Sequence, residues 1–208
     1  MTKIKFGYKD IDELDKPKEV NNVFTSVSNN YDVMNDIMSF GLHRLWKKQF
    51  IRLCNIKSQK KVLDIACGSG YLLNLCYKRF GSSLKLTGVD MSNSELELAR
   101  KKLNSTNYKL HLGMAQDLSF LEDSSFDAIL CHWALTLMDP IVPVLNNIYR
   151  LLKNKGFFAA IIDGDMDAVH EYKKIHNIIY KYVQKEYPNY GTIELGDVRV
   201  RNSKDLKK

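Results

Sequence analysis

Apolar and polar positions alternate with two different periods along the chain from residue 60 onward. Five short apolar runs have the length of buried strands: residues 60–66, 84–90, 108–113, 125–133 and 156–164. Three segments between them space their apolar residues as amphipathic helices do: residues 71–80, 92–103 and 140–153. This alternation predicts an α/β fold, a doubly wound, mostly parallel sheet with helices on both faces and right-handed crossovers.

Two of the predicted helices carry signals at their ends. Ser92 and Glu95 have the S-x-x-E spacing of a capping box, which predicts that a helix begins there. Gly81 directly follows the periodic segment 71–80 and is expected to end that helix.

The chain divides into three expected regions within one structural domain. Residues 1–55 form an N-terminal segment, residues 56–165 hold the alternating core, and residues 166–208 hold a helix and a tail. The C-terminal helix candidate, at 166–187, is long and stops before Pro188. The short tail that follows predicts an incomplete C-terminal part of the fold.

Composition suits one globular domain. The chain has 208 residues, of which 45% are hydrophobic, enough for a substantial core. No apolar run reaches the roughly 18–20 residues of a spanning helix, so no integral membrane segment is expected. The charged N-terminus lacks the apolar core of a secretory signal, and the four cysteines form no C-x-x-C pair. Free thiols in a reducing compartment are the simplest interpretation, which predicts a cytoplasmic protein.

The net charge of +7 could indicate binding to nucleic acid or to an acidic membrane surface. The basic residues are nevertheless spread along the chain and interleaved with acidic ones, as in ELELARKK at residues 95–102. That pattern is typical of solvated helix faces. The chain also lacks an N-P-P-[YF] target-base motif, so no nucleic-acid partner is expected.

The stretch VLDIACGSGYLL, residues 62–73, places two glycines directly between a strand and a helix. Gly68 and Gly70 permit a tight turn and close approach of a ligand to backbone N–H groups at a helix start. Leu73 stands where a dinucleotide-binding loop has its third glycine, and no G-K-[ST] follows. A phosphate-binding loop is therefore disfavoured.

Two acidic residues lie near this loop in the predicted sheet. Asp90 ends the second strand, 22 residues after Gly68, where a carboxylate can accept hydrogen bonds from both hydroxyls of an adenosine ribose. Asp64 could position the loop or meet the ammonium of a bound amino acid. Taken singly, each is more simply a solvated strand-end residue, and Asp90 could instead cap the following helix. Together with the loop they indicate a nucleoside ligand without a diphosphate, S-adenosylmethionine, and removing Asp90 is then expected to leave folding almost unchanged.

Several segments resemble class I S-adenosylmethionine-dependent methyltransferases: LDIACGSG, GVDMS, AQDLSF, SFDAIL and IYRLLKNKG. The stretch VFTSVSNNYDVMNDIMSFGLHRLWK, residues 23–47, is similar to the N-terminal signature of the ubiquinone/menaquinone-biosynthesis C-methyltransferase family, within the methyltransferase-11 group. The resemblance implies a Rossmann-like sheet with strand order 3-2-1-4-5 and an N-terminal helical lid over the cofactor cleft. The family's C-terminal antiparallel hairpin is expected to be missing.

The same resemblance implies a transferase that uses S-adenosyl-L-methionine and a small, aromatic or apolar acceptor, with no metal. Ser69 matches a loop hydroxyl that contacts cofactor, Met91 is expected to pack on the adenine, and the Ala115 N–H to meet an adenine nitrogen. His132 and Tyr31 are the catalytic candidates, needed only if the acceptor loses a proton. The implied cofactor-binding set is Asp64, Ala66, Gly68, Ser69, Gly70, Asp90, Met91, Met114, Ala115 and His132. The implied lid residues are Tyr31, Met34, Met38, Phe40 and Trp46.

Three positions depart from the family pattern. Ala66 replaces a usual glycine or small residue, and Met114 stands where Asn or Asp is usual. Thr136 stands where the quinone-methylating enzymes have an active-site Arg, which puts quinone methylation in doubt but not methyl transfer. A cofactor-binding or scaffold protein of the same fold without turnover is the alternative, and a homodimer stays open.

Overall fold

The computed structural model describes residues 3–6, 9–12, 15, 18–19, 22, 36–37, 39–56, 60–103, 107–162 and 185. The strands in this part of the chain are β1 (Lys3–Phe6), β2 (Lys9–Asp12), β3 (Lys61–Ile65), β4 (Lys85–Asp90), β5 (Tyr108–Leu112), β6 (Phe126–His132) and β7 (Leu152–Ile161). The α-helices are α3 (Leu42–Leu53), α4 (Tyr71–Phe80), α5 (Asn93–Lys102) and α6 (Ile141–Leu151). Two short 3₁₀ turns are η3 (Gly81–Ser83) and η4 (Leu135–Leu137).

Five parallel strands form the central sheet, in the order β5-β4-β3-β6-β7. This is the predicted order 3-2-1-4-5, and it is confirmed. Ile65 pairs with Val89 on one side and with Cys131 on the other, so β3 lies in the centre of the sheet. The strand order reverses between β3 and β6, which is where open α/β sheets bind their ligands.

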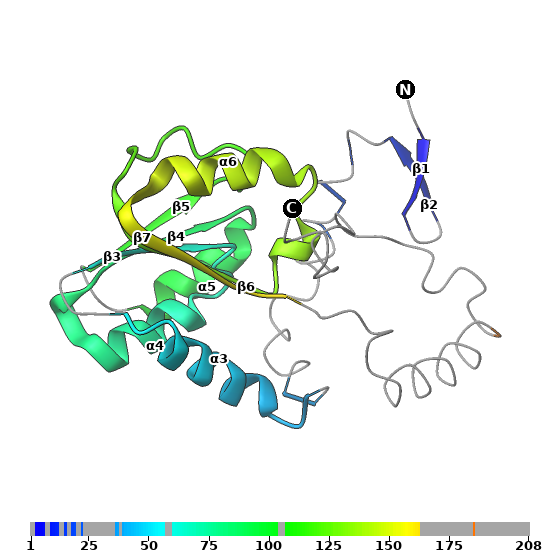
Figure 1. Cartoon of the computed structure of the whole chain (residues 1–208). Coiled ribbons are helices and arrows are strands. Elements are labelled where there is room, and N and C mark those ends of the chain that lie inside the picture. The colour runs from blue at the N-terminus through cyan, green and yellow to red at the C-terminus, as the bar shows by residue number, and fades with distance from the viewer. Residues whose placement is uncertain are drawn as a thin grey trace, which may run out of the picture.

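Helices cover both faces of the sheet, as predicted. Figure 1 shows α6 on one face and α3, α4 and α5 on the other. The alternation of side chains along the strands produces this arrangement. Leu63 and Ile129 belong to the apolar core under α6, whereas Val62 and Leu130 belong to the core under the other three helices. All four side chains are fully buried.

The predicted helix ends are confirmed for α4 and α5. Gly81 follows α4 with φ 61°, a conformation that favours glycine. The Ser92 hydroxyl accepts a hydrogen bond from the Glu95 N–H at 3.4 Å and so caps α5.

The last described strand begins earlier than predicted. β7 starts at Leu152, directly after α6, instead of at Gly156. Phe126 pairs with Leu152 but Ala128 pairs with Phe157, so an irregularity takes up the additional residues of β7. The sequence pattern missed this start because the polar run from Lys153 to Lys155 resembles a turn.

The N-terminal pair β1–β2 was not predicted. It is antiparallel, with Lys3 opposite Asp12 and Phe6 opposite Lys9, and each strand has only four residues. Apart from Lys185, which is helical, the expected C-terminal helix at 166–187, the tail and the missing hairpin concern residues outside those described. No helix in the described part of the chain is long and apolar enough to cross a membrane.

Candidate functional site

The glycine loop connects β3 to α4 at the carboxyl edge of the sheet. Ala66, Gly68 and Gly70 have φ values of 57°, 51° and 73°. The loop is fixed to the neighbouring strand because the Cys67 N–H donates to the Val89 carbonyl at 3.1 Å. A Cβ on Gly70 would lie 2.9 Å from Leu103 Cδ1, so a side chain there would push α5 away from the loop. The sequence pattern therefore predicted both the turn and its position correctly.

The loop backbone is open on the side of Gly68. A Cβ added there would meet a single described atom within 4 Å, Glu95 Oε2 at 3.6 Å. A ligand can therefore approach the main chain closely at this point, as the expected cofactor requires.

Asp90 lies at the end of β4 and faces this loop. Its side chain is 8% exposed. Oδ2 accepts a hydrogen bond from the Gly68 N–H at 2.7 Å, and Oδ1 accepts one from the Ser92 N–H at 2.8 Å. Burial raises the pKa of Asp90, while the N–H groups of Ser92, Gly68 and Met91 lower it.

These bonds agree with the alternative that Asp90 caps the following helix, because the carboxylate joins the glycine loop to the start of α5. The expectation that removal of Asp90 leaves folding almost unchanged assumed that its side chain supports little else, and these two bonds argue against that assumption. Each carboxylate oxygen has two acceptor positions. The two backbone bonds thus leave one position on each oxygen for a ribose hydroxyl, and Asp90 fits both roles.

Asp64 is the more deeply buried acid, at 2% exposure. Burial, and to a lesser extent the negative charge of Asp90, raise its pKa to about 8 despite the opposing positive charge of Lys47. The carboxyl group therefore lies at the sheet edge in a site where an approaching cation would stabilise its ionised form.

Lys47 is a residue that the sequence analysis missed. It lies on α3, and its Nζ is 4.6 Å from the centroid of the Tyr71 ring, at the first residue of α4. A signal for it was available in the spacing: Lys47 follows the buried His43 by four residues and precedes the buried Phe50 by three.

The expected adenine-side residues gather at the ends of β4 and β5. Met91 is half-buried, Met114 is 38% exposed and Ala115 is buried. The Asn147 side chain on α6 donates to the carbonyls of Ala115 and Gln116 at 3.1 and 2.9 Å, and so fixes this segment. Asn147 was not predicted, because nothing in the sequence links it to a segment 31 residues earlier.

The Ser69 hydroxyl, expected to contact cofactor, lies 2.9 Å from Lys102 Nζ. Lys102 is the last residue of α5 and is exposed. The structure thus adds a second lysine beside the glycine loop, on the α5 side.

His132 ends β6, next to the centre of the sheet. Its ring lies 4.9 Å from that of Trp133 and 5.8 Å from that of Phe50, between centroids. Within the described part of the chain, its buried Nε2 has no hydrogen-bond partner. Burial, followed by the charges of Lys47 and His43, lowers the pKa of His132 to about 4. The imidazole is therefore neutral at pH 7 and available as a proton acceptor. Tyr31, the other catalytic candidate, lies outside the described residues.

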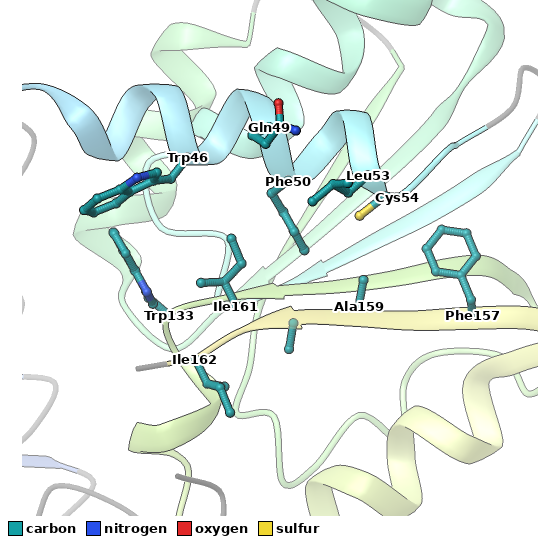
Figure 2. Close-up of a pocket in the computed structure, with 11 residues that line it drawn as sticks. Trp46, Gln49, Phe50, Leu53, Cys54, Trp133, Phe157, Ala159, Ile161 and Ile162 are labelled. Carbon is teal, nitrogen blue, oxygen red and sulfur yellow. The ribbon is translucent and has the colours of Figure 1, made fainter. Parts of the chain in front are cut away.

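An apolar cavity of about 760 Å³, open to the surface, lies between α3 and β7, and its lining residues Phe50 and Trp133 pack against the His132 ring. Figure 2 shows Phe50 projecting from α3 toward the sheet, with Trp46 and Trp133 facing each other at one end. The two indole rings form an edge-to-face pair with centroids 5.3 Å apart. The lining residues are Trp46, Gln49, Phe50, Leu53, Cys54, Trp133, Phe157, Ala159, Ala160, Ile161 and Ile162. Trp46 was predicted as a lid residue and Trp133 was not.

The remaining predicted lid residues, and Thr136, which departs from the family pattern, do not line the cavity in the described part of the chain. Phe40 is 94% exposed, whereas Met34 and Met38 lie outside the described residues. Thr136 lies in η4 and is only 1% exposed, so its side chain does not reach an open site. Among the described residues, no group of three or more His, Cys, Asp or Glu side chains could hold a metal ion.

Sequence comparison matches the chain to one family. The model of the ubiE/COQ5 methyltransferase family covers residues 12–195. Ubiquinone/menaquinone biosynthesis C-methyltransferase UbiE of Rickettsia akari (strain Hartford) is 36% identical over 210 residues, covering 95% of this chain and 80% of that protein. Demethylmenaquinone methyltransferase of Symbiobacterium thermophilum is 34% identical over 159 residues, covering 74% of this chain and 63% of that protein.

Solved structures share the fold. The putative methyltransferase in complex with the Haloferax volcanii Trm112 activator has a TM-score of 0.59 at 22% identity, over 73% of this chain and 66% of that chain. Haemonchus contortus phosphoethanolamine N-methyltransferase 2, in complex with S-adenosyl-L-methionine, has a TM-score of 0.56 at 18% identity, over 78% of this chain and 34% of that chain. At these identities the likeness concerns the arrangement of strands and helices.

Proposed function

Because the chain belongs to the ubiE/COQ5 methyltransferase family and is an S-adenosylmethionine-dependent methyltransferase, we propose that it methylates a ring carbon of a quinol-type aromatic acceptor. The observation that carries the proposal is the aromatic, apolar cavity beside His132. The relatives support such an acceptor, since one is a ubiquinone/menaquinone biosynthesis C-methyltransferase and the other a demethylmenaquinone methyltransferase.

The donor side of the site fits S-adenosylmethionine. The open backbone at Gly68 and the remaining acceptor positions of Asp90 suit an adenosine ribose. Met91 and Met114 offer apolar surface for the adenine at the ends of two neighbouring strands. When bound, the sulfonium supplies a methyl group that is already activated for transfer.

The acceptor side favours a flat, apolar ring. Trp46 and Trp133 present ring faces and edges, which bind aromatic groups well. A volume of about 760 Å³ lies within the usual range of pockets for small organic ligands. Alignment of the acceptor with the donor, with water excluded, can contribute roughly 7–11 kcal/mol to lowering the barrier.

Methylation at carbon also needs a group that accepts a proton from the acceptor. A quinol hydroxyl that loses its proton makes the adjacent ring carbon nucleophilic. This carbon bonds to the methyl group as the methyl–sulfur bond breaks, and loss of the ring C–H proton with reprotonation of the oxygen restores the aromatic quinol, so one proton is released in total. We assign the first proton transfer to the neutral His132, whose buried Nε2 has no described partner and whose ring adjoins two lining residues of the cavity. Thr136, at the position of the family's active-site Arg, is buried and has no basic group.

The test is incubation with methyl-labelled S-adenosylmethionine and a panel of short-chain demethylmenaquinol analogues, simple phenols and amines. We expect label on a ring carbon of the quinol analogues, identified by mass spectrometry and NMR, and at least about 100-fold less transfer in the His132→Phe variant. Transfer only to an oxygen or nitrogen would overturn the choice of acceptor. Binding of S-adenosylhomocysteine without transfer to any acceptor would favour the alternative of a cofactor-binding protein without turnover.

A further inference from the structure

We infer that the outer face of α3 binds the surface of a bilayer that contains anionic phospholipids. The bilayer then lies beside the cavity between α3 and β7. The inference goes beyond methyl transfer, because it rests on the exposed side chains of one helix and on no property of the donor or the acceptor.

Exposed apolar side chains are concentrated on α3 and directly before it. Of the twelve large apolar side chains that are exposed in the described part of the chain, six lie between Ile37 and Leu53. Phe40, Leu45 and Leu53 are 94%, 59% and 73% exposed. Apolar surface in water is unfavourable, and a cluster of this kind marks an interaction site.

The exposed apolar residues of α3 form one row along the helix. Leu42, Leu45 and Leu53 recur at the spacing of a helix face, on the side opposite the buried Ile51. Trp46, which is 42% exposed, and Leu53 also line the cavity. Figure 2 shows these two side chains on α3 above the strands that form the floor of the cavity. The apolar row therefore continues to the mouth of the cavity.

A basic row lies beside the apolar row. Arg44, Lys48 and Arg52 recur at every fourth residue, and all three are exposed. The helix contains no acidic residue, in contrast to α5, where charges of both signs are interleaved. Asp36, which precedes the helix, pairs with Arg44 at 2.5 Å, so Lys48 and Arg52 supply the excess positive charge. The interleaved pattern of a solvated helix face therefore applies to α5 but not to α3.

This arrangement fits a lipid surface better than the surface of a protein. An interfacial helix inserts its Leu, Phe and Trp side chains at the level of the headgroups and first acyl carbons, while flanking Lys and Arg side chains extend to the phosphates. A protein partner needs acidic groups at positions that match Lys48 and Arg52, whereas an anionic leaflet offers negative charge everywhere. The bilayer also brings its apolar layer to the mouth of the cavity, where an apolar acceptor enters without crossing water.

The test measures partition of the full chain onto sedimented vesicles, without donor or acceptor. The vesicles contain phosphatidylcholine alone or phosphatidylcholine with roughly 30% phosphatidylglycerol. We expect partition to be at least about 10-fold stronger on the anionic vesicles. Lys48→Gln combined with Arg52→Gln should weaken it by about 10- to 30-fold, at about fivefold for each charge. Leu42→Gln combined with Leu45→Gln should weaken it by about 10- to 100-fold.

Two double variants on other elements are the matched controls. Lys101→Gln with Lys109→Gln removes the same charge from exposed positions of α5 and β5. Val142→Gln with Leu145→Gln removes exposed apolar side chains from α6, which lies on the opposite face of the sheet (Figure 1). Neither control should change partition by more than about twofold, because charges far from the bilayer are screened by salt. The Tm of every variant, expected to match that of the unaltered chain, shows that it is folded.

Tryptophan fluorescence tests which face meets the bilayer. The two tryptophans of the chain, Trp46 and Trp133, both line the cavity beside α3. When α3 lies on the bilayer, a spin label on the first carbons of the lipid acyl chains should quench their emission. The quenching should be lost in the Lys48→Gln, Arg52→Gln variant, because less of that variant is bound.

Three results would overturn the inference. If the unaltered chain stayed in solution with both kinds of vesicle, the outer face of α3 would be left for a protein partner. Equal partition onto neutral and anionic vesicles, or equal losses in the control variants, would remove the two rows of α3 from the contact. Binding without tryptophan quenching would place another face on the bilayer. None of these measurements needs methyl transfer, so failure here is distinguishable from failure of the proposed function.

Discussion

At the residue scale, the Asp90 carboxylate accepts two backbone hydrogen bonds and is also predicted to bind the ribose of the methyl donor. Asp90→Ala removes the acceptors of the Gly68 and Ser92 N–H groups, so we expect a loss of about 1–3 kcal/mol in the free energy of unfolding. Affinity for S-adenosylhomocysteine should fall by about 30- to 1,000-fold, since two ribose hydroxyls lose their partner. Urea unfolding and calorimetry on the same variant measure both effects. Unchanged affinity would end the ribose assignment, and unchanged stability would contradict the structural one.

Ala66 is strained in a way that its glycine counterpart would not be. Its φ of 57° lies in the left-handed region, where a Cβ costs roughly 1–2 kcal/mol. Part of this is offset because glycine gains more freedom in the unfolded chain. Ala66→Gly is therefore expected to raise the free energy of unfolding by about 0.5–1 kcal/mol, measured by urea denaturation. Ala99→Gly, within α5, is the control: glycine inside a helix should lower the free energy of unfolding. A loss of stability in both variants would contradict the prediction.

The sequence predicted which residues surround the loop better than it predicted their bonds. Gly68, Gly70 and Asp90 could be recognised because spacing along a βαβ unit places them at one sheet edge. The bond from the Gly68 N–H to Asp90 depends on the exact turn of the loop, which no pattern of residue types specifies. Lys47 was missed because the Tyr71 ring that it contacts lies on α4, which only tertiary packing brings to α3.

At the scale of elements, α3 joins the two halves of the site. Lys47 on this helix lies over the Tyr71 ring, next to the glycine loop. Trp46 and Phe50 on the same helix line the cavity opposite β7. The N-terminal signature was expected to contain helices, and α3 begins within it. That this helix helps to enclose the substrate stays a prediction. The exact bounds of α3 depend on Gly41, which precedes the helix with φ 75°, and on packing against α4, which sequence periodicity does not specify.

Trp46 provides the element-scale prediction. If the cavity holds the acceptor ring, Trp46→Ala should raise the KM for a quinol analogue by about 5- to 20-fold, because an aromatic contact is lost. Affinity for S-adenosylhomocysteine should stay within about twofold, since Trp46 lies on the acceptor side. Steady-state kinetics and calorimetry provide these values. Leu45→Ala, at a position 59% exposed and outside the cavity lining, is the control, and an equal rise in KM there would count against the cavity.

At the scale of the whole molecule, the pKa values of carboxyl groups are shifted in opposite directions at the two edges of the sheet. Asp127 lies at the amino edge, where burial alone would raise its pKa. Hydrogen bonds from Lys153, the Lys61 N–H and Lys60 instead lower the pKa of Asp127 to about 2. Asp64 and Asp90 at the carboxyl edge have raised pKa values. The protein therefore stabilises the ionised form of the carboxyl group at the amino edge, whereas burial disfavours the ionised forms at the carboxyl edge, where the ligand site is predicted.

This contrast leads to a prediction for Asp64 with a definite sign. Its pKa is about 8 in the folded chain and about 3.9 when unfolded, so the folded state binds the extra proton between these values. The stabilisation is complete below about pH 4 and is lost as the pH rises toward 8, by up to about 1.4 kcal/mol per pH unit. Asp64→Asn cannot bind this proton. The difference in the free energy of unfolding, variant minus unaltered chain, should therefore rise from pH 5 to pH 8. Urea unfolding without ligand measures it. The affinity of the variant for S-adenosylhomocysteine should fall, because the α-ammonium loses its partner.

Asp127→Asn is the control for this pH dependence, because its sign is opposite. The lowered pKa of Asp127 gives stability that is present above about pH 4 and is lost as the pH falls toward 2. The curves of this variant and the unaltered chain should therefore run parallel from pH 5 to 8 and approach each other only in acid. If the Asp64→Asn curve also ran parallel to that of the unaltered chain from pH 5 to 8, Asp64 would be ionised at no cost in the folded state. The donor edge would then hold a carboxylate already stabilised by the protein, and ligand binding would not be needed to explain its burial.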